Sequence, residues 1–436
     1  MGSKGETTNT ASRSEANKPS RLNVVVCGGG IAGFATALLL REDHDVTVLE
    51  SSSLNEELGA AITLSINASR LLRSSIERAG FDKVKAGYVE AEKFQELHWQ
   101  DLSVILEWQI SKVTEAYKEP WWYFSRKDIH AELKRAALSP DGLGTAPRLV
   151  LGAHVERVDL ENQTVVLSSG ERFHGDVIIG ADGIRSASGN SVFGKLQTVP
   201  EGLSAYRCMI QSEKLKDNPA TEILVDSTKV LMLIGPDRRI VAYPCSNWNW
   251  INFVCIFPDD EDRRLQWHDT VTVEEMVQKF QDFHPSIPAA LSMASNTGMW
   301  RLRDRVPLST LAKGCYAIIG DAAHAMGPHQ GQGACQALED AEALRIILKG
   351  STPLDVPARL KIYDELRVER IAKVMEYTRA MAPSKTGSLE VNHKTTQTYS
   401  DYYWSYKITA DAVALMRTHG HALKIVDEAT GKIEFE

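Results

Sequence analysis

The sequence is poor in the features that mark secreted, membrane and zinc-binding proteins. Its six cysteines form no CxxC pair and no compact cluster with histidine, which argues against a zinc site or a disulfide framework. They lie mostly in apolar, strand-like runs, so we expect buried, reduced thiols in a cytosolic protein. No apolar run approaches the ~18 residues of a membrane span. Residues 1–20 lack the apolar core of a signal peptide and are predicted to form a disordered tail.

The chain also lacks an excess of positive charge. Its net charge of −8 at pH 7 disfavours nucleic acid as a partner, since such binders usually carry a basic field. Its 43% hydrophobic and 24% charged residues are ordinary for a globular protein. A chain of 436 residues exceeds one simple core, so two or three domains are expected.

A glycine-rich stretch, "GGGIAG" at 28–33, stands between two apolar segments. The pattern predicts a buried parallel strand, a buried helix and a second strand that ends at Glu50, over residues 22–26, 31–40 and 46–49. This order of strand, glycine loop, helix, strand and terminal acid is typical of a dinucleotide-binding unit. The motif by itself does not distinguish FAD from NAD.

Each part of that unit has a physical task. Gly28 permits the tight turn, Gly30 lets the backbone approach a pyrophosphate, and Gly33 allows helix and strand to pack closely. The helix N-terminus offers free N–H groups and positive potential to the phosphates. Glu50 can accept hydrogen bonds from both ribose hydroxyls, which argues against NADP in this site.

A second glycine-rich stretch, "GDAAHAMGPHQGQG", lies at 320–333. It follows a predicted strand at 315–319, and Gly331–Gly333 open a predicted helix with one apolar face, formed by Ala334, Ala337, Leu338, Ala341 and Leu344. A second helix N-terminus is therefore offered to a ligand. FAD is long enough to use both loops, one for its ADP half and one for its ribityl chain and ring.

Taken together, the motifs make the sequence resemble the single-component, salicylate hydroxylase-like flavoprotein monooxygenases (group A aromatic hydroxylases, here of the fungal type). The motifs occur in the order of that family: the loop at 28–33, "SRKDIHAEL" at 125–133, "DVIIGADGIRS" at 176–186 and "GDAAHAMGPHQGQGA" at 320–334. The resemblance covers roughly residues 21–380. It implies non-covalent FAD, with NAD(P)H as co-substrate.

The resemblance also implies roles for cofactor-binding residues. Glu50 would bind the adenosine ribose, Ala61 would contact FAD through its backbone, and Arg126 would lie near the phosphates or ribityl chain. Asp182 belongs to a motif linked to both pyrophosphate and nicotinamide binding. Asp321 would hydrogen-bond a ribityl hydroxyl.

At the flavin ring, Gly333 and Ala334 would present backbone N–H groups to the pyrimidine edge, where helix potential favours anionic reduced flavin. One departure is visible, because the family's middle motif usually carries arginine where this chain has Gly189. This departure bears on the approach of nicotinamide and not on FAD. His324 and His329 lack a third ligand of suitable spacing, so we predict packing roles and no metal.

Residues 200–257 change to repeated strand-like runs with turns at 235–238 and 246–247, which predicts an antiparallel sheet that forms the substrate domain. By resemblance to fungal phenol hydroxylases, Arg207 in "AYR" and Tyr243 in "AYP" would hold a phenolate. A guanidinium stabilises a phenolate and a phenol hydroxyl can donate to it. The alternative roles are a surface ion pair for Arg207 and simple packing for Tyr243.

Two other aromatic stretches need an interpretation. "NWNWINF" at 247–253 partly matches a flavin halogenase motif, but Asn252-Phe253 stands in place of Ile-Pro, so sheet packing is favoured. The cluster at 399–416 could cap the substrate pocket or contact a second subunit, and we favour a helix packed on the core.

The predicted fold is α/β, with an interrupted Rossmann-like FAD-binding domain, an inserted antiparallel β-sheet substrate domain and C-terminal helices. The expected ranges are 1–20 for the tail, 21–100 with 121–195 and 298–360 for the FAD domain, 101–120 with 196–297 for the substrate domain, and 361–436 for the C-terminal helical segment.

The resemblance implies O₂-dependent hydroxylation of an aromatic, phenolic small molecule through a C4a-hydroperoxyflavin, by a cytoplasmic monomer or homodimer of secondary metabolism. Alternatives are epoxidation of an alkene or indole, a flavin-dependent reductase or dehydrogenase, and a non-catalytic FAD-binding regulator.

Overall fold

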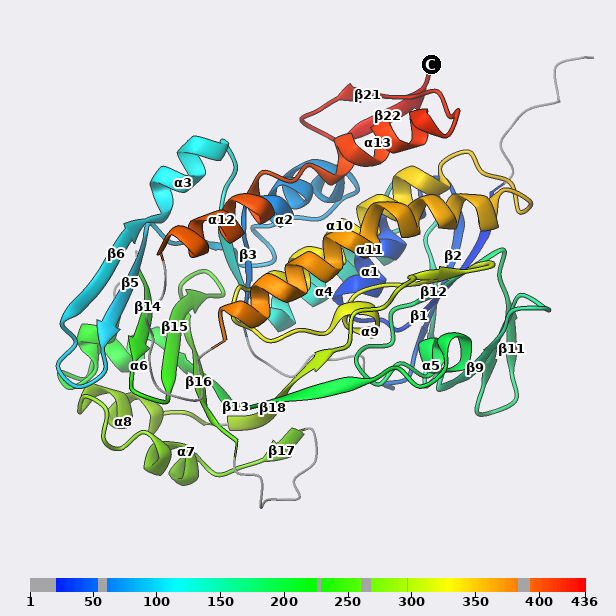
Figure 1. Cartoon of the computed structure of the whole chain (residues 1–436). Helices are drawn as coiled ribbons and strands as arrows, with labels where there is room; N and C mark the ends of the chain where they lie inside the picture. Colours follow the sequence, from blue (N-terminus) through cyan, green and yellow to red (C-terminus); the bar gives the residue numbers. More distant parts are fainter. Residues whose placement is uncertain (1–20, 54–60, 226–228, 260–267, 296, 383–392) are drawn as a thin grey trace, which may run out of the picture.

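The computed structural model describes residues 21–53, 61–225, 229–259, 268–295, 297–382 and 393–436. The predicted tail at 1–20 lies outside these residues. Two large sheets dominate the fold, and the helices α10 (Gln332–Leu348) and α11 (Val356–Ala380) run side by side across the molecule (Figure 1). Within the described residues, no helix is long and apolar enough to cross a membrane.

The first large sheet has six strands in the order β19-β20-β12-β1-β2-β8. Its pairs are parallel except for β19 with β20. The strands are β1 (Asn23–Cys27), β2 (Asp45–Glu50), β8 (Arg148–Leu151), β12 (Val177–Gly180), β19 (Ala312–Lys313) and β20 (Tyr316–Ile318). The predicted strand–helix–strand unit is confirmed, and α1 occupies the predicted range, Ile31–Leu40.

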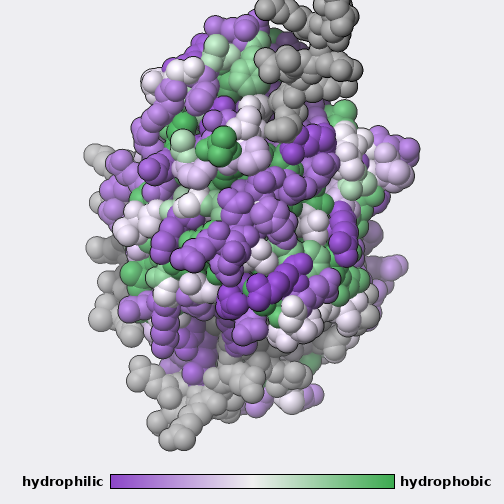
Figure 2. Space-filling model, turned by 90° about the vertical axis from the view of Figure 1, so that its right-hand side faces the viewer, coloured by the Kyte–Doolittle hydropathy of each residue, from purple (hydrophilic) through white to green (hydrophobic). Residues whose placement is uncertain are grey.

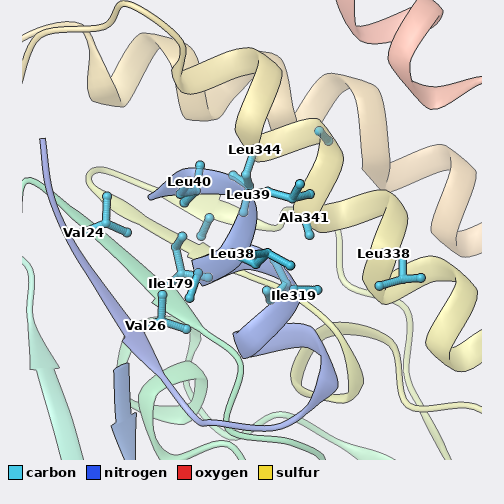
Figure 3. Packing of buried hydrophobic residues seen from close by; sticks show 14 of the residues in the cluster. Val24, Val26, Leu38, Leu39, Leu40, Ile179, Ile319, Leu338, Ala341 and Leu344 are labelled. Carbon is cyan, nitrogen blue, oxygen red and sulfur yellow. The ribbon is translucent and has the colours of Figure 1, made fainter. Parts of the chain in front are cut away.

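Helix α1 is buried on nearly every side because it lies between the parallel sheet and α10. All its residues except Ala32 are buried. In Figure 3 its leucines point between strand residues on one side and α10 on the other, with Val24, Val26, Leu38, Leu39, Leu40, Ile179, Ala341 and Leu344 in view. Burial of this apolar set fixes where the glycine loop before α1 sits against the sheet.

The second large sheet has eight strands in the order β17-β18-β13-β16-β15-β14-β5-β6. Its strands are β5 (Lys93–His98), β6 (Val104–Gln109), β13 (Thr198–Gln211), β14 (Lys229–Ile234), β15 (Arg239–Cys245), β16 (Trp250–Pro258), β17 (His268–Thr270) and β18 (Thr297–Arg305). The antiparallel sheet predicted at 200–257 is confirmed, since the pairs β13–β16, β14–β15 and β15–β16 are all antiparallel; in addition, β14 pairs with β5 in parallel. That pair joins segments from separate parts of the chain, which a hairpin pattern does not reveal.

The two faces of the eight-stranded sheet have different neighbours. One face packs on α7 (Val273–Lys279) and α8 (Ser286–Leu291) in an apolar core. The other face packs on a small sheet of β3 (Ala61–Leu64), β7 (Trp122–Ser125) and β4 (Val89–Glu90), which belongs to the half of the chain that carries the first glycine loop.

A sharp turn at the end of β15 connects the eight-stranded sheet by hydrogen bonds to the part of the chain that carries the first glycine loop. Ser246, Asn247 and Trp248 all have positive φ angles, between 51° and 67°. The Asn247 N–H donates to the Gly87 carbonyl at 3.0 Å, and the Ser246 hydroxyl donates to Asp128. These bonds hold strained backbone in place at the predicted turn.

The C-terminal segment contains helices and a hairpin. It runs through α11 to α12 (His393–Trp404), α13 (Ile408–Thr418), β21 (Leu423–Asp427) and β22 (Lys432–Phe435) (Figure 1). The remaining elements are α2 (Ile66–Leu71), η1 (Leu72–Ile76), α3 (Ile110–Tyr117), α4 (Arg126–Leu138), β9 (Val155–Asp159), β10 (Thr164–Leu167), β11 (Arg172–His174), α5 (Ala187–Phe193), α6 (Ser212–Lys216), η2 (Glu222–Leu224) and α9 (Asp321–His324). The face shown in Figure 2 mixes hydrophilic and hydrophobic side chains, as a solvent-exposed surface does.

Candidate active site

The first glycine loop is built by close backbone contacts. Gly28 has a φ of +111°, and its N–H donates to the Leu49 carbonyl at 2.7 Å. A Cβ on Gly28 would lie 2.4 Å from the Ala181 carbonyl oxygen, and one on Gly33 would lie 2.0 Å from the Gly28 carbonyl oxygen. A Cβ on Gly30 would meet nothing within 4 Å. Gly28 and Gly33 therefore have no room for a side chain, whereas Gly30 faces open space. A phosphate-binding loop requires this arrangement.

Glu50 at the end of β2 holds this loop in shape. One carboxylate oxygen, Oε2, accepts the Gly29 N–H at 2.7 Å, and the other accepts the Ser52 N–H at 2.7 Å. Oε1 also accepts from the Ser51 hydroxyl at 3.3 Å, and Glu50 is half-buried, so its Oε2 keeps a further lone pair for a ligand. On the opposite side, His130 of α4 contacts the Gly29 carbonyl through Nε2 at 2.7 Å. His130 is a residue that sequence reasoning missed, although it lies inside the arginine motif.

Asp182 organises the loop after β12. Its carboxylate accepts the Ser188 N–H and hydroxyl, each at 2.9 Å, and also the Ser186 hydroxyl. A Cβ on Gly189 would lie 2.7 Å from side-chain atoms of both Ile318 and Leu196. An arginine cannot stand at Gly189 without moving these residues, which explains the departure at this position.

The second glycine loop places Asp321 at the start of α9 with its side chain exposed. Among the described residues, no hydrogen bond or ion pair engages the Asp321 carboxylate. Gly320 just before it has a φ of +58°, and its N–H donates to buried Asp340 at 3.0 Å. The loop is thus fixed from behind, while the Asp321 carboxylate stays available.

Arg305 of β18 is buried and contacts both the loop that carries Asp182 and the loop that carries Asp321. Sequence reasoning did not identify this residue. Its Nη2 donates to the Ile184 carbonyl at 2.6 Å, and its N–H donates to the Ala325 carbonyl at 2.8 Å. Burial lowers the pKa of Arg305, and the charges of Asp321 and Asp182 partly oppose this change. The residues around Arg305 form no motif that would indicate this role.

Helix α10 begins at the second loop with its N-terminus open. Gly331 is the N-cap, with a φ of +64°, and a Cβ there would lie 2.3 Å from Thr63 Cγ2. Gly333 and Ala334 follow in the first turn, where backbone N–H groups have no partner within the helix. Both are partly exposed, and a Cβ on Gly333 would meet nothing within 4 Å. An anionic or hydrogen-bond-accepting ring edge fits in front of them.

A buried ionic network holds α10 and the loop before it. Asp340 accepts from the Arg367 Nε at 3.0 Å and lies 2.7 Å from His324 Nε2. Glu339 accepts from Arg367 at 2.6 Å and from the Asn67 amide at 2.7 Å. These charges are paired and hydrogen-bonded, so their burial is tolerated. His324 is part of this buried polar network, through its contact with Asp340.

Arg207 lies on the face of the eight-stranded sheet that is turned away from α7 and α8. Its neighbours Tyr206 and Cys208 pack in the core against those helices, and side chains alternate along β13. The Arg207 Cζ lies 5.3 Å from the centre of the Trp300 ring, and the buried Nε has no hydrogen-bond partner among the described residues. Burial lowers the pKa of Arg207, Arg126 lowers it further, and Tyr243 and Asp321 oppose this.

Tyr243 of β15 lies in the apolar cluster on the same side of the sheet. Its ring centre is 5.1 Å from that of Tyr123 on β7. Burial raises the pKa of Tyr243, and the neighbouring Arg207 charge opposes the rise. The structure thus brings Arg207 and Tyr243 into one electrostatic environment, together with Arg126 and Asp321.

Ala61 at the start of β3 meets Asn252 of β16. The Ala61 N–H donates to Asn252 Oδ1 at 3.1 Å, so that N–H is engaged within the protein. Its predicted backbone contact with FAD remains a prediction. Asn252 is fully buried, and its Nδ2 has no hydrogen-bond partner in the described part of the chain. An asparagine within the otherwise apolar strand β16 marks a buried polar residue, but it does not indicate the partner.

A row of aromatic rings extends from this cluster to the C-terminal segment. Ring centres are 5.2 Å apart for Phe94 and Trp108, 5.7 Å for Trp108 and Trp121, and 5.3 Å for Trp121 and Trp404. Trp121 also donates to the Thr63 hydroxyl at 2.6 Å. Trp404 at the end of α12 therefore packs onto the cluster beside the candidate site.

These residues fit FAD by shape and by donor set. Open space lies in front of Gly30 and Gly333, two helix N-termini offer free N–H groups, and the Asp321 carboxylate has no hydrogen bond from the described part of the protein. The fold and the paired loops define a dinucleotide-binding flavoprotein.

The comparisons with known proteins agree. A family model described as "FAD binding domain" matches residues 21–378. The chain belongs to this FAD-binding family and is an FAD-dependent monooxygenase. This finding removes the reductase, dehydrogenase and non-catalytic regulator alternatives.

Two fungal relatives and one solved structure illustrate the likeness. FAD-dependent monooxygenase cfoG of Aspergillus candidus is 32% identical over 85% of this chain and 87% of its own. Hispidin-3-hydroxylase of Neonothopanus nambi is 31% identical over 81% of this chain and 87% of its own. A salicylate hydroxylase substrate complex superimposes with a TM-score of 0.72 at 26% identity, covering 91% of this chain and 98% of that one.

Proposed function

We propose that the protein hydroxylates a phenolic aromatic small molecule, using FAD, NAD(P)H and O₂. The family uses NAD(P)H as reductant. The observation that carries the proposal is the Arg207 guanidinium, which lies on the inner face of the sheet. It has no carboxylate partner among the residues that the structure describes, and it is close enough to Tyr243 to affect the pKa of that phenol.

Arg207 stabilises the ionised oxygen of the substrate. A guanidinium in a buried, weakly screened place lowers the pKa of a phenol bound beside it. Ionisation makes the aromatic ring electron-rich and therefore reactive toward an electrophilic oxygen atom. The Trp300 ring holds the guanidinium without neutralising it, so the charge remains available for the substrate.

Tyr243 donates its hydroxyl hydrogen to the same oxygen. Its raised pKa keeps the phenol protonated, so it acts as a donor throughout the neutral range. Tyr123 and the partly buried aromatic rings Phe94, Trp108 and Trp121 form apolar walls that orient a flat ring and exclude water.

FAD, when bound, supplies the redox chemistry: it takes electrons from the reductant and activates O₂. Glu50 would hold the adenosine end, and the N-terminus of α1 at Gly30 would hold the phosphates. Asp321 would meet the ribityl chain, and the backbone of Gly333 and Ala334 would meet the edge of the ring. Arg126 and Asp182, from the two remaining motifs, would supply further charged contacts.

The names of several relatives support the substrate class. Besides hispidin-3-hydroxylase, two proteins of Streptomyces platensis named 3-amino-4-hydroxybenzoate 2-monooxygenase are 28% and 29% identical to this chain. Salicylate and hydroxybenzoate are phenols that carry a carboxylate, so the shared class is a small phenolic acid or a larger phenol.

The experiment is a panel of phenols and matched non-ionising analogues, such as the corresponding methyl ethers. NAD(P)H consumption, hydroxylated product and H₂O₂ are measured together. We expect product formation with a phenol and mainly H₂O₂ with its ether. Equal product yield from phenol and ether overturns the phenolate mechanism and favours epoxidation of a neutral alkene or indole.

A further inference from the structure

A buried charged cluster joins the second glycine loop to the eight-stranded sheet. The side chain of His329 is 1% exposed, and its Nε2 lies 2.8 Å from the Glu201 Oε2. Its Nδ1 is hydrogen-bonded to Nη2 of Arg239, which is itself buried. The three side chains form a continuous chain, which we call the His329 bridge: Glu201, His329 and Arg239.

The chemistry of the partners fixes the protonation state of His329. Arginine has only donors, so His329 Nδ1 must accept from Arg239 with its lone pair. The ring hydrogen is therefore on Nε2, where it is donated to the Glu201 carboxylate. Burial lowers the pKa of His329, the Arg239 charge lowers it further, and Glu201 opposes both. The imidazole is neutral in the bridge.

The bridge connects the parts of the site that must be aligned. Glu201 belongs to β13, the strand of Arg207, and Arg239 belongs to β15, the strand of Tyr243. His329 stands two residues before the N-cap of α10. A change in the bridge therefore acts on the loop and on both strands that carry the proposed substrate residues.

The loop has little freedom around the imidazole. A Cβ on Gly327 would lie 2.4 Å from Glu201 Oε1 and 2.6 Å from His329 Nε2. At the other end of the loop, Gly331 has positive φ and packs against Thr63. The backbone from 327 to 331 is thus fixed by the bridge at one end and by β3 at the other.

We propose that His329 is a positioning residue, which through Glu201 and Arg239 holds the 327–331 backbone so that the first N–H groups of α10 face the flavin edge. The inference goes beyond the proposed function. It rests on that function only for the place of the flavin edge at Gly333 and Ala334.

Acid should open the bridge. A second proton on His329 would have to sit on Nδ1, against the N–H group of Arg239, so the docked loop resists protonation. The pKa of His329 is lowered while the bridge is intact, so a loop whose bridge has opened is protonated first as pH falls below about 6.5. Protonation of the opened form therefore weakens the bridge. Among the described residues, the other charged groups near the bridge are Glu96 of β5, which opposes the lowering of the Arg239 pKa, and Asp304 of β18, whose pKa is raised by burial and by the Glu201 charge and which pairs with Arg379 of α11.

The test measures FAD affinity by fluorescence titration of apoprotein at about pH 7.5 and about pH 5.5. The variants are His329→Gln and His329→Ala, and His419→Ala is the matched control because His419 pairs with Glu365 on the surface. Glutamine can accept from Arg239 and donate to Glu201, but it does not titrate. We expect wild type to lose affinity on acidification and His329→Gln to keep its neutral affinity at both pH values.

His329→Ala should bind FAD on the order of tenfold more weakly at neutral pH, because two hydrogen bonds to charged groups are lost. His419→Ala should follow wild type at both pH values. Neutral affinity of His329→Ala equal to wild type would overturn the inference, and so would an acid loss in His329→Gln as large as in wild type.

A double-mutant cycle separates the bridge from general loss of structure. Glu201→Ala, His329→Ala and the double variant are compared for FAD affinity, with circular dichroism to confirm folding. If the residues act as one unit, the double variant is no weaker than the worse single variant, whereas additive losses contradict the bridge. These readouts need no substrate, so a failure of the phenol panel leaves them unaffected.

Discussion

The guanidinium of Arg207 lies over the indole ring of Trp300, with Cζ 5.3 Å from the ring centre. The two residues stand on neighbouring strands, β13 and β18, and the contact is made on the inner face of the sheet. An aromatic partner stabilises the cation by its ring electrons and does not cancel its charge. This arrangement distinguishes Arg207 from the arginines that are locked in carboxylate pairs, such as Arg367.

Replacing Arg207 should uncouple the reaction without removing the cofactor. Arg207→Ala should bind FAD as wild type does, since no cofactor loop is altered, but should give less product per NAD(P)H and more H₂O₂. Arg207→Lys keeps the charge and loses the planar fork, so it should recover part of the yield. Arg238→Ala is the matched control, because Arg238 pairs with Asp282 at the far side of the sheet.

The pH dependence checks the same prediction. Wild type and Arg207→Ala are compared for product yield across the pKa of the phenol substrate. We expect the defect of Arg207→Ala to be largest below that pKa, where the enzyme must ionise the substrate itself. A variant that matches wild type at every pH would assign Arg207 a purely structural role.

Tyr243→Phe should lower kcat/KM on the order of tenfold, because one hydrogen bond to an ionised oxygen is lost. The shape of the pH profile should stay the same, since burial keeps the Tyr243 phenol protonated in wild type. Tyr206→Phe is the control, as Tyr206 lies in the core on the opposite face. A new titration step in Tyr243→Phe would show that the hydroxyl does more than donate.

The sequence predicted those elements of the fold that depend on residues close together in the chain. The strand, loop and helix around Gly28 follow from apolar runs and glycine spacing, and α1 begins and ends where the pattern placed it. The second loop was recognised in the same way. The roles of Arg207 and Tyr243 came from resemblance, and the structure adds that both lie on the inner side of one sheet.

Contacts between distant segments were not predictable from the sequence. Asn252 meets Ala61 across 191 positions, and Arg305 meets Ile184 across 121. Such partners depend on which strands become neighbours, and a single polar residue in an apolar strand does not reveal that. The parallel pairing of β14 with β5 has the same origin.

Glu50 should control FAD affinity far more than turnover of the loaded enzyme. Glu50→Ala removes the acceptor of the Gly29 N–H as well as the proposed acceptor for the ribose hydroxyls. Losing hydrogen bonds to a charged acceptor should weaken FAD binding by about 1.5–3 kcal/mol, or on the order of ten- to hundredfold. At saturating FAD, kcat should be close to that of wild type. Unchanged FAD affinity would mean that Glu50 only shapes the loop.

Asp321 of the second loop and Asp340 of α10 form a matched pair that should differ in its effect on stability. Asp321 is exposed and has no hydrogen-bond partner among the described residues, whereas Asp340 is buried and contacts Gly320, His324 and Arg367. Asp321→Asn should therefore leave the free energy of unfolding of the apoprotein unchanged and weaken FAD binding. Its carboxylate is available only to a ligand.

Asp340→Asn should instead lower the free energy of unfolding by about 3–5 kcal/mol, because Arg367 loses a buried carboxylate partner. FAD binding should weaken as well, since the Gly320 N–H is fixed by this side chain. Denaturant unfolding of both apoproteins, followed by FAD titration, separates the two effects. If Asp321→Asn destabilises the apoprotein as much as Asp340→Asn does, Asp321 has a structural partner and its assignment to the ribityl chain is wrong. If it alters neither stability nor affinity, the second loop holds FAD through its backbone alone.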